Sequence, residues 1–125
     1  MVKILIVDDE PDNLDILRDV LTAEGYRVVE AVDGPTGVAT ARTERPDFVL
    51  MDVMIGGNPQ GLVATQQLKA SADTRHIPVV ALTASVLPEN RRSAIDAGCC
   101  DLVAKPFDFD HLLGIIRKYL PGASA

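Results

Sequence analysis

The chain has 125 residues, enough for one domain, and its apolar share of 47% supports a buried core rather than a disordered segment. Lys and Arg number 12 and Asp and Glu 18, so the net charge is −6; direct nucleic-acid binding is disfavoured because it needs basic residues to neutralise phosphates. No apolar stretch is long enough for membrane insertion and no leader precedes the first apolar run, so we expect a cytoplasmic protein.

Apolar runs alternate with amphipathic segments along the chain. The first run, Lys3–Val7, is rich in β-branched residues and predicts a strand covered on both faces. The segment 12–24 repeats leucine at helical spacing and is followed by Gly25, a residue typical of helix ends. The remaining predicted strands are at 27–31, 48–51, 78–83 and 102–104. A second helix is opened by Pro35 at its first position and ended by Pro46, and a third helix spans 61–69. The last two helices run from Pro88 to Gly98 and over 108–120, where Pro121 and Gly122 stop the chain's final helix.

This alternation of strands and helices predicts an α/β fold. Parallel neighbours need crossover connections, which are right-handed, and the crossing helices cover both faces of the sheet. Five such units in about 120 residues fit a flavodoxin-like (βα)5 architecture. We therefore expect a doubly wound, parallel, five-stranded sheet with the strand order 2-1-3-4-5.

Polar side chains collect where four of the predicted strands end. Because the carboxyl ends of parallel strands meet at one edge of a sheet, residues far apart in sequence should converge there. The second strand contributes no comparable residue. The set consists of Asp8, Asp9, Asp52, Thr83 and Lys105.

These residue types favour a cation and a phosphoryl group. Clustered carboxylates repel one another unless a cation is present, and oxygen ligands suit Mg²⁺ or another divalent ion. We expect Asp9 and Asp52 to bind the ion directly and Asp8 to act through water. Thr83 can donate a hydrogen bond to an anionic oxygen, and Lys105 offers it a positive charge. An aspartate beside a metal ion is also a credible nucleophile for phosphoryl transfer.

Four segments together resemble a response-regulator receiver domain of two-component signalling, of the stand-alone type. They are ILIVDDEP at the start, VLMDVM around Asp52, VVALTA around Thr83 and AGCCDLVAKPF around Lys105, and the resemblance covers roughly residues 2–120. It implies a receiver domain at 1–121 with a short tail at 122–125. It also implies a protein that is not an enzyme beyond catalysing its own phosphoryl acceptance and slow loss.

The resemblance further assigns roles to the residues at the strand ends. Asp52 would accept a phosphoryl group from a histidine kinase or a histidine phosphotransfer protein. Asp8, Asp9 and Asp52 would hold Mg²⁺ together with the backbone carbonyl of Met54, and Thr83 and Lys105 would contact the phosphoryl oxygens. The surface of the fourth helix, fifth strand and fifth helix would then change its binding of a downstream protein partner. The peptide bond before Pro106 is often cis in this family.

The chain departs from the family pattern in two places. Leu102 stands where most receivers carry an aromatic residue that rotates on phosphorylation, so the output surface should respond differently. After Asp52, Gly56 replaces the usual proline and Gly61 follows nine residues on, which makes this loop one residue longer than usual. Gly56 and Gly57 should also make the loop more permissive.

Other interpretations of the same residues remain open. The polar segment after the first strand also fits a turn with Asp12 as the N-cap of the next helix. A pseudo-receiver would bind a partner without phosphorylation, and a small Mg²⁺-dependent phosphohydrolase would use a similar acidic site. The sequence also leaves open whether the protein is a monomer or a weak dimer. Cys99 and Cys100 are expected to be structural thiols, and His76 and His111 to lie at the surface, in a loop and on the last helix.

Overall fold

The computed structural model describes residues 1–120, and its elements alternate strictly between strand and helix. The predicted tail at 122–125, the last residue of the predicted domain and the predicted helix stop at Pro121 and Gly122 lie outside the described residues. The elements are β1 (Lys3–Val7), α1 (Pro11–Ala23), β2 (Arg27–Ala31), α2 (Gly34–Glu44), β3 (Phe48–Asp52), α3 (Gln60–Ala70), β4 (Val79–Thr83), α4 (Pro88–Ala97), β5 (Asp101–Ala104) and α5 (Phe109–Tyr119).

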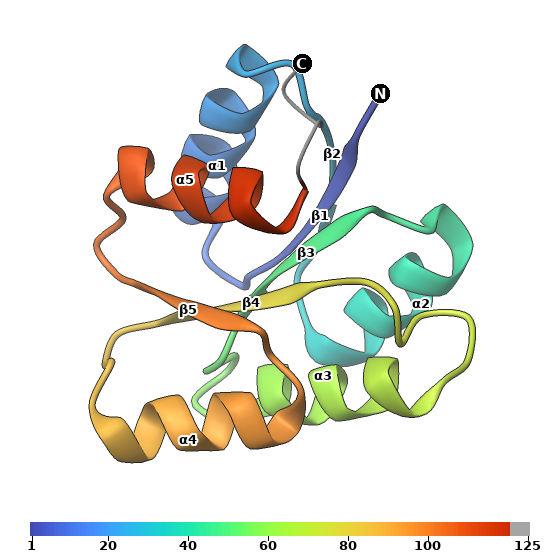
Figure 1. Ribbon diagram of the computed structural model, residues 1–125, viewed down its shortest axis with the longest axis vertical. Helices are drawn as coiled ribbons and strands as arrows, with labels where there is room; N and C mark the ends of the chain where they lie inside the picture. Colours follow the sequence, from blue (N-terminus) through green and yellow to red (C-terminus); the bar gives the residue numbers. More distant parts are fainter. Residues whose placement is uncertain (121–125) are drawn as a thin grey trace.

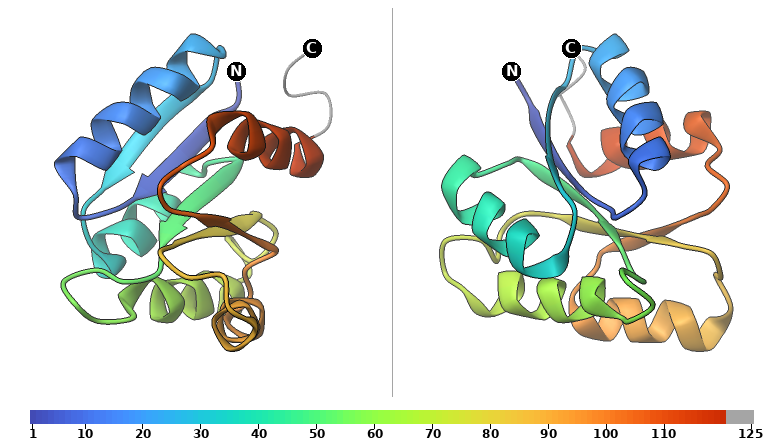
Figure 2. Two further views of the ribbon diagram at one scale, coloured as in Figure 1. Left: turned by 90° about the vertical axis from the view of Figure 1, so that its left-hand side faces the viewer. Right: turned by 180° about the vertical axis from the view of Figure 1, so that it is seen from behind.

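All strand pairs in the five-stranded sheet are parallel, and the order is β2-β1-β3-β4-β5. Figure 1 shows α1 and α5 on one face of this sheet and α2, α3 and α4 on the other, and the turned views of Figure 2 agree. The predicted flavodoxin-like fold and its strand order are therefore confirmed. Among the described residues, no helix is long and apolar enough to span a bilayer.

Two apolar cores hold the three layers together, and the strands alternate between them residue by residue. In β1, Leu5 and Val7 pack with the helices α2, α3 and α4, whereas Ile4 and Ile6 pack with α1 and α5. Each such side chain contributes about 1.5–3 kcal/mol when it is fully buried. Burial on both faces explains why β1, β3 and β4 are nearly continuous apolar runs, whereas the edge strand β2 carries Arg27 and Glu30.

Several element boundaries differ from the sequence-based expectation by one residue. The helix α1 begins at Pro11, whose missing N–H costs nothing in a first turn, and its N-cap is Glu10. The interpretation of Asp12 as the N-cap is therefore wrong. Pro35 occupies the second position of α2 rather than the first, because the side chain of Asp33 caps this helix by accepting a hydrogen bond from the Thr36 amide.

Candidate functional site

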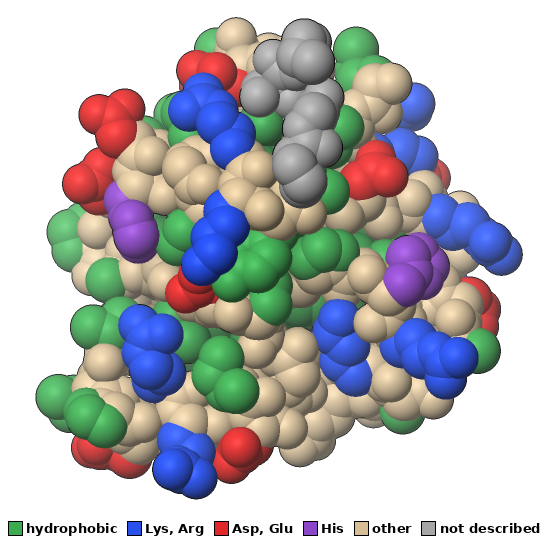
Figure 3. All heavy atoms as spheres, in the orientation of Figure 1, with side chains coloured by type: hydrophobic (Ala, Val, Ile, Leu, Met, Phe, Trp, Pro, Cys, Tyr) green, Lys and Arg blue, Asp and Glu red, His purple; other side chains and the backbone are tan. Residues whose placement is uncertain are grey.

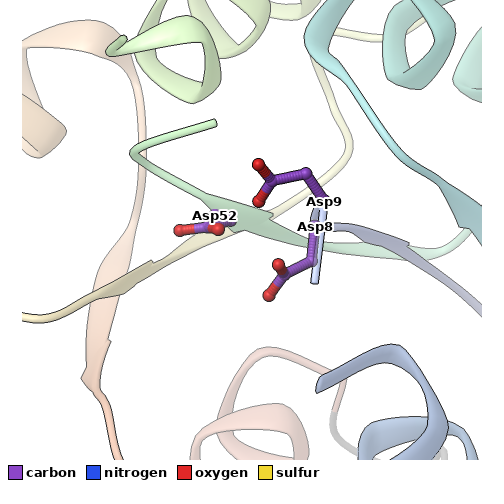
Figure 4. A group of neighbouring side chains, drawn as sticks. All are labelled: Asp8, Asp9 and Asp52. Atoms are coloured by element: carbon purple, nitrogen blue, oxygen red, sulfur yellow. The ribbon is translucent and has the colours of Figure 1, made fainter. Parts of the chain in front are cut away.

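The three carboxylates lie together because β1 and β3 are neighbours in register. Val7 pairs with Met51, so Asp8 and Asp52 follow at matching heights on adjacent strands. One carboxylate oxygen from each of Asp8, Asp9 and Asp52 lies within 4.8 Å of the others. Figure 4 shows the carboxylates of Asp8 and Asp9 extending to the side of β1 on which Asp52 lies. The predicted convergence of these three residues is confirmed.

Asp8 is fully buried and both of its carboxylate oxygens accept hydrogen bonds. The Glu10 amide donates to Oδ1 at 2.9 Å, and the side-chain amide of Asn13 donates to Oδ2 at 3.2 Å. Asn13 was not among the predicted site residues. Its place five residues after Asp8, in the first turn of α1, could have suggested it.

Lys105 brings the opposite charge into the site from the end of β5. Its Nζ lies 3.0 Å from Asp52 Oδ1 and 3.6 Å from Asp8 Oδ2, and its side chain is 23% exposed. The Lys105–Pro106 peptide bond is cis, as the resemblance implied. One ammonium group thus bridges two carboxylates from different strands.

The electrostatics of Asp52 leave its ionised form only partly compensated. Burial raises the pKa of Asp52 to about 6; Lys105 acts against this rise and the nearby charge of Asp8 adds to it. A hard divalent cation fits this pocket because all three donors are carboxylate oxygens and one ammonium group balances only part of their charge. The residues present therefore suit Mg²⁺.

Thr83 lies at the same edge, at the end of β4, but its hydroxyl faces its own loop. Oγ1 donates to the Ser85 carbonyl at 2.9 Å and accepts from the Ser85 amide at 3.1 Å. Ser85 was not predicted as a site residue. A hydroxyl has only one proton to donate, so Thr83 can donate to a phosphoryl oxygen only by releasing Ser85.

Met54 follows Asp52 by two residues and leads into a closed hairpin at the rim of the site. Ile55 and Asn58 exchange two backbone hydrogen bonds of 2.9 and 3.1 Å across Gly56 and Gly57. Both glycines have positive φ, +61° and +77°, as a type I′ turn requires. The two glycines therefore adopt the left-handed conformations that glycine permits, and they build a defined turn at this position.

The residues outside the pocket behave as structural groups. Leu102 is buried, and Cys99 and Cys100 are free thiols, the first buried and the second half-buried. Burial raises the pKa of Cys99 to about 11, which disfavours its thiolate. His76 lies in an exposed turn and His111 on the exposed side of α5, as predicted.

Comparison with known proteins identifies relatives over nearly the whole chain. A family model described as "Response regulator receiver domain" matches residues 4–117. Protein PilH of Pseudomonas aeruginosa is 39% identical over 122 residues, which cover 98% of this chain and 100% of that protein. The polar-differentiation response regulator DivK of Brucella anthropi is 32% identical over 121 residues, which cover 97% of this chain and 98% of that protein. Response regulator PleD of Caulobacter vibrioides is 41% identical over 116 residues, which cover 93% of this chain but only 25% of that protein.

Solved structures give the same picture. A putative response regulator from Chloroflexus aurantiacus has a TM-score of 0.89 at 28% identity, covering 95% of this chain and 97% of that one. The receiver domain of the sensor histidine kinase PA1611 from Pseudomonas aeruginosa has a TM-score of 0.86 at 34% identity, and the match covers 95% of this chain and 97% of that one. That receiver was crystallised with a magnesium ion coordinated in its active-site cleft.

Proposed function

The chain belongs to the family of response regulator receiver domains, and from this membership we propose that it accepts a phosphoryl group on Asp52 and signals by binding another protein. The observation that carries the proposal is the buried Asp52 carboxylate, which lies beside Asp8 and Asp9 and within 3.0 Å of the ammonium group of Lys105. Receivers are normally classed as non-enzymatic, and the chemistry proposed here is limited to the protein's own phosphoryl acceptance and slow loss. We propose a cytoplasmic protein whose receiver domain is 1–121.

Asp52 is the proposed nucleophile. One of its carboxylate oxygens attacks the phosphorus of a phosphohistidine on a histidine kinase or a histidine phosphotransfer protein. A P–O bond forms while the P–N bond breaks, and the imidazole leaves with the electron pair of that bond. In such transfers the protein contributes chiefly positioning and charge stabilisation.

Asp8, Asp9, Asp52 and the backbone carbonyl of Met54 would hold Mg²⁺ or another divalent cation. When bound, the cation supplies positive charge that offsets the charges of the carboxylates and the phosphoryl oxygens. Lys105 already lies 3.0 Å from Asp52 Oδ1 and would donate to a phosphoryl oxygen attached there. Thr83 would donate to a second oxygen after leaving the Ser85 carbonyl.

The face made by α4, β5 and α5 is the proposed output surface. Figure 3 shows Lys and Arg side chains among apolar ones on this side of the molecule, and Leu87 and Ile95 of this region are exposed. Thr83 connects to α4 through Ser85, whose hydroxyl accepts a hydrogen bond from the side-chain amide of Asn90 at 2.8 Å. Because Leu102 is buried and carries no ring, we propose that α4 rather than residue 102 reports phosphorylation to a downstream partner.

The proposal is tested by incubating the protein with acetyl phosphate and Mg²⁺ and measuring its intact mass. We expect a gain of one phosphoryl group that excess EDTA prevents, because the acidic pocket needs the cation to receive another anion. No gain with any small donor would contradict the proposal and favour a pseudo-receiver that binds its partner without phosphorylation. Repeated release of phosphate from a generic ester would favour the phosphohydrolase instead.

Replacing Lys105 with Met should preserve the fold and weaken binding of beryllofluoride, a phosphoryl mimic, about tenfold, since one charge-assisted hydrogen bond is lost. The affinity is measured in Mg²⁺ by two-dimensional NMR. Lys3→Met is the matched control, because Lys3 pairs with Glu44 at 3.1 Å outside the site; its affinity should equal that of the wild type. Equal affinity in Lys105→Met and the wild type would contradict the proposed role of Lys105.

A further inference from the structure

Asp9 is held differently from the other two carboxylates of the pocket. Asp8 and Asp52 are 0% and 3% exposed, so packing and hydrogen bonds fix their positions. Asp9 is exposed at the rim, where packing does little to restrict its rotamer. Its Oδ2 accepts a hydrogen bond of 3.0 Å from the Gly56 amide, 47 residues away in sequence. The position of Asp9 therefore depends on the loop that contains Gly56.

That loop is stiff enough to hold a side chain. The paired backbone bonds between Ile55 and Asn58 close the turn, and the side-chain amide of Asn58 also donates to the Gly56 carbonyl at 3.2 Å. The Gln60 amide then donates to the Asn58 carbonyl at 2.8 Å, which ties the turn to the start of α3. The Gly56 amide thus points at Asp9 from a doubly anchored turn.

The same segment carries the proposed carbonyl ligand. Met54 directly precedes Ile55, so the hairpin (residues 55–58) fixes one end of the backbone at Met54, and the pairing of β3 fixes the other. The hydrogen bond to Gly56 uses one oxygen of Asp9 and leaves the other available. Groups that orient metal ligands in this way typically change metal affinity about 10–100-fold.

We propose that the hairpin at residues 55–58 is a positioning element for the cation, with the Gly56 amide orienting Asp9. The inference rests on the proposed function, because it concerns the same cation, and it gives the two glycines of the longer loop a role. Without the hairpin, Asp9 would sample several rotamers and binding would have to order it.

Gly56→Val tests the proposal, because a β-branched residue disfavours the φ of +61° that the turn requires. The nearest atom to a Cβ at Gly56 would be the side-chain Nε2 of Gln60, at 3.7 Å, so backbone strain rather than a clash of the Cβ opens the turn. The Kd for Mg²⁺ alone is measured by calorimetry. We expect Gly56→Val to bind Mg²⁺ about tenfold more weakly than the wild type.

Two further variants separate positioning from general strain. Gly56→Asn creates the Asn-Gly pair that type I′ turns prefer and keeps the amide donor, so it should bind Mg²⁺ like the wild type. Gly25→Val places the same side chain at a φ of +90° in open space away from the pocket, and it should also leave the Kd unchanged. Thermal unfolding without Mg²⁺ shows that each variant is folded.

Equal Mg²⁺ affinity in Gly56→Val and the wild type would overturn the inference, as would an equal loss in Gly25→Val or in Gly56→Asn. If Gly56→Val does not fold, failure of Gly56→Asn to reproduce the wild-type Kd overturns it. A wild type that binds no Mg²⁺ overturns both the inference and the proposed function. If the wild type binds Mg²⁺ and the hairpin variants behave as expected, but acetyl phosphate adds no mass, only the proposed function fails.

Discussion

Asp52→Asn is expected to lose all phosphoryl acceptance from acetyl phosphate and yet to be more stable than the wild type at pH 7 without Mg²⁺. The carboxamide is a very poor nucleophile, so the mass gain should vanish. It has the shape of the carboxylate but no charge, so it removes the repulsion between Asp52 and the buried Asp8. Lys105 keeps its second partner, Asp8 Oδ2, at 3.6 Å.

The stability gain should depend on pH in a defined direction. Folding raises the pKa of Asp52 from 3.8 to about 6, so the folded protein binds this proton more tightly than the unfolded chain. The folded state therefore gains stability from the protonated Asp52 carboxyl; this gain is complete below pH 3.8 and is lost as the pH rises through about 6. At pH 7 the ionised Asp52 therefore costs the metal-free protein on the order of 1–3 kcal/mol relative to a neutral group.

Urea unfolding of the wild type and Asp52→Asn between pH 4 and pH 7 measures this effect. The difference in unfolding free energy should grow in favour of the variant as the pH rises, and Mg²⁺ should reduce it by stabilising the wild type. Asp96→Asn, at an exposed position on α4, is the control and should keep both the mass gain and the wild-type pH profile. If the difference in unfolding free energy between the two proteins stays constant across this pH range, ionisation of Asp52 does not destabilise the folded protein as inferred.

Gly61→Ala is expected to lower the free energy of unfolding by about 3 kcal/mol, which is near the upper end of the usual cost of adding an atom to a closely packed site. A Cβ at Gly61 would lie 1.9 Å from the carbonyl oxygen of Asp52 and 2.9 Å from the Cα of Val53. The contacted atoms are backbone and cannot rotate away. The first turn of α3 must therefore move off the end of β3, which displaces Asp52 as well.

The matched control is Gly114→Ala on α5, where an added Cβ meets no atom within 4 Å. Since alanine favours the helix, this variant should be more stable by up to about 1 kcal/mol. Urea unfolding gives both free energies, and acetyl phosphate labelling shows the effect on the site. If Gly61→Ala unfolds like the wild type, α3 does not pack against the end of β3 as described.

The fold could be predicted from the sequence because each local signal agreed with the others. Short apolar runs, separated by helical segments and by glycine or proline, specify buried parallel strands and crossover helices. The carboxylates and the lysine could also be located, because each lies at the end of a strand or within two residues after it, and all strands of a parallel sheet end on one side. Boundaries were less certain: Asp12 looks like an N-cap in sequence, but Pro11 begins the helix.

The tertiary structure decided the details that depend on long-range contacts. The sequence by itself determined that Asp8, Asp9, Asp52 and Lys105 would share one edge, since strand ends are a local property. Whether Thr83 faces the pocket or Ser85, and whether Gly56 and Gly57 are free or closed, depends on hydrogen bonds that exist only after the chain has folded. The bond from Gly56 to Asp9 joins residues 47 apart. No sequence pattern encodes that bond, because it requires β1 and the loop after β3 to be brought together by the sheet.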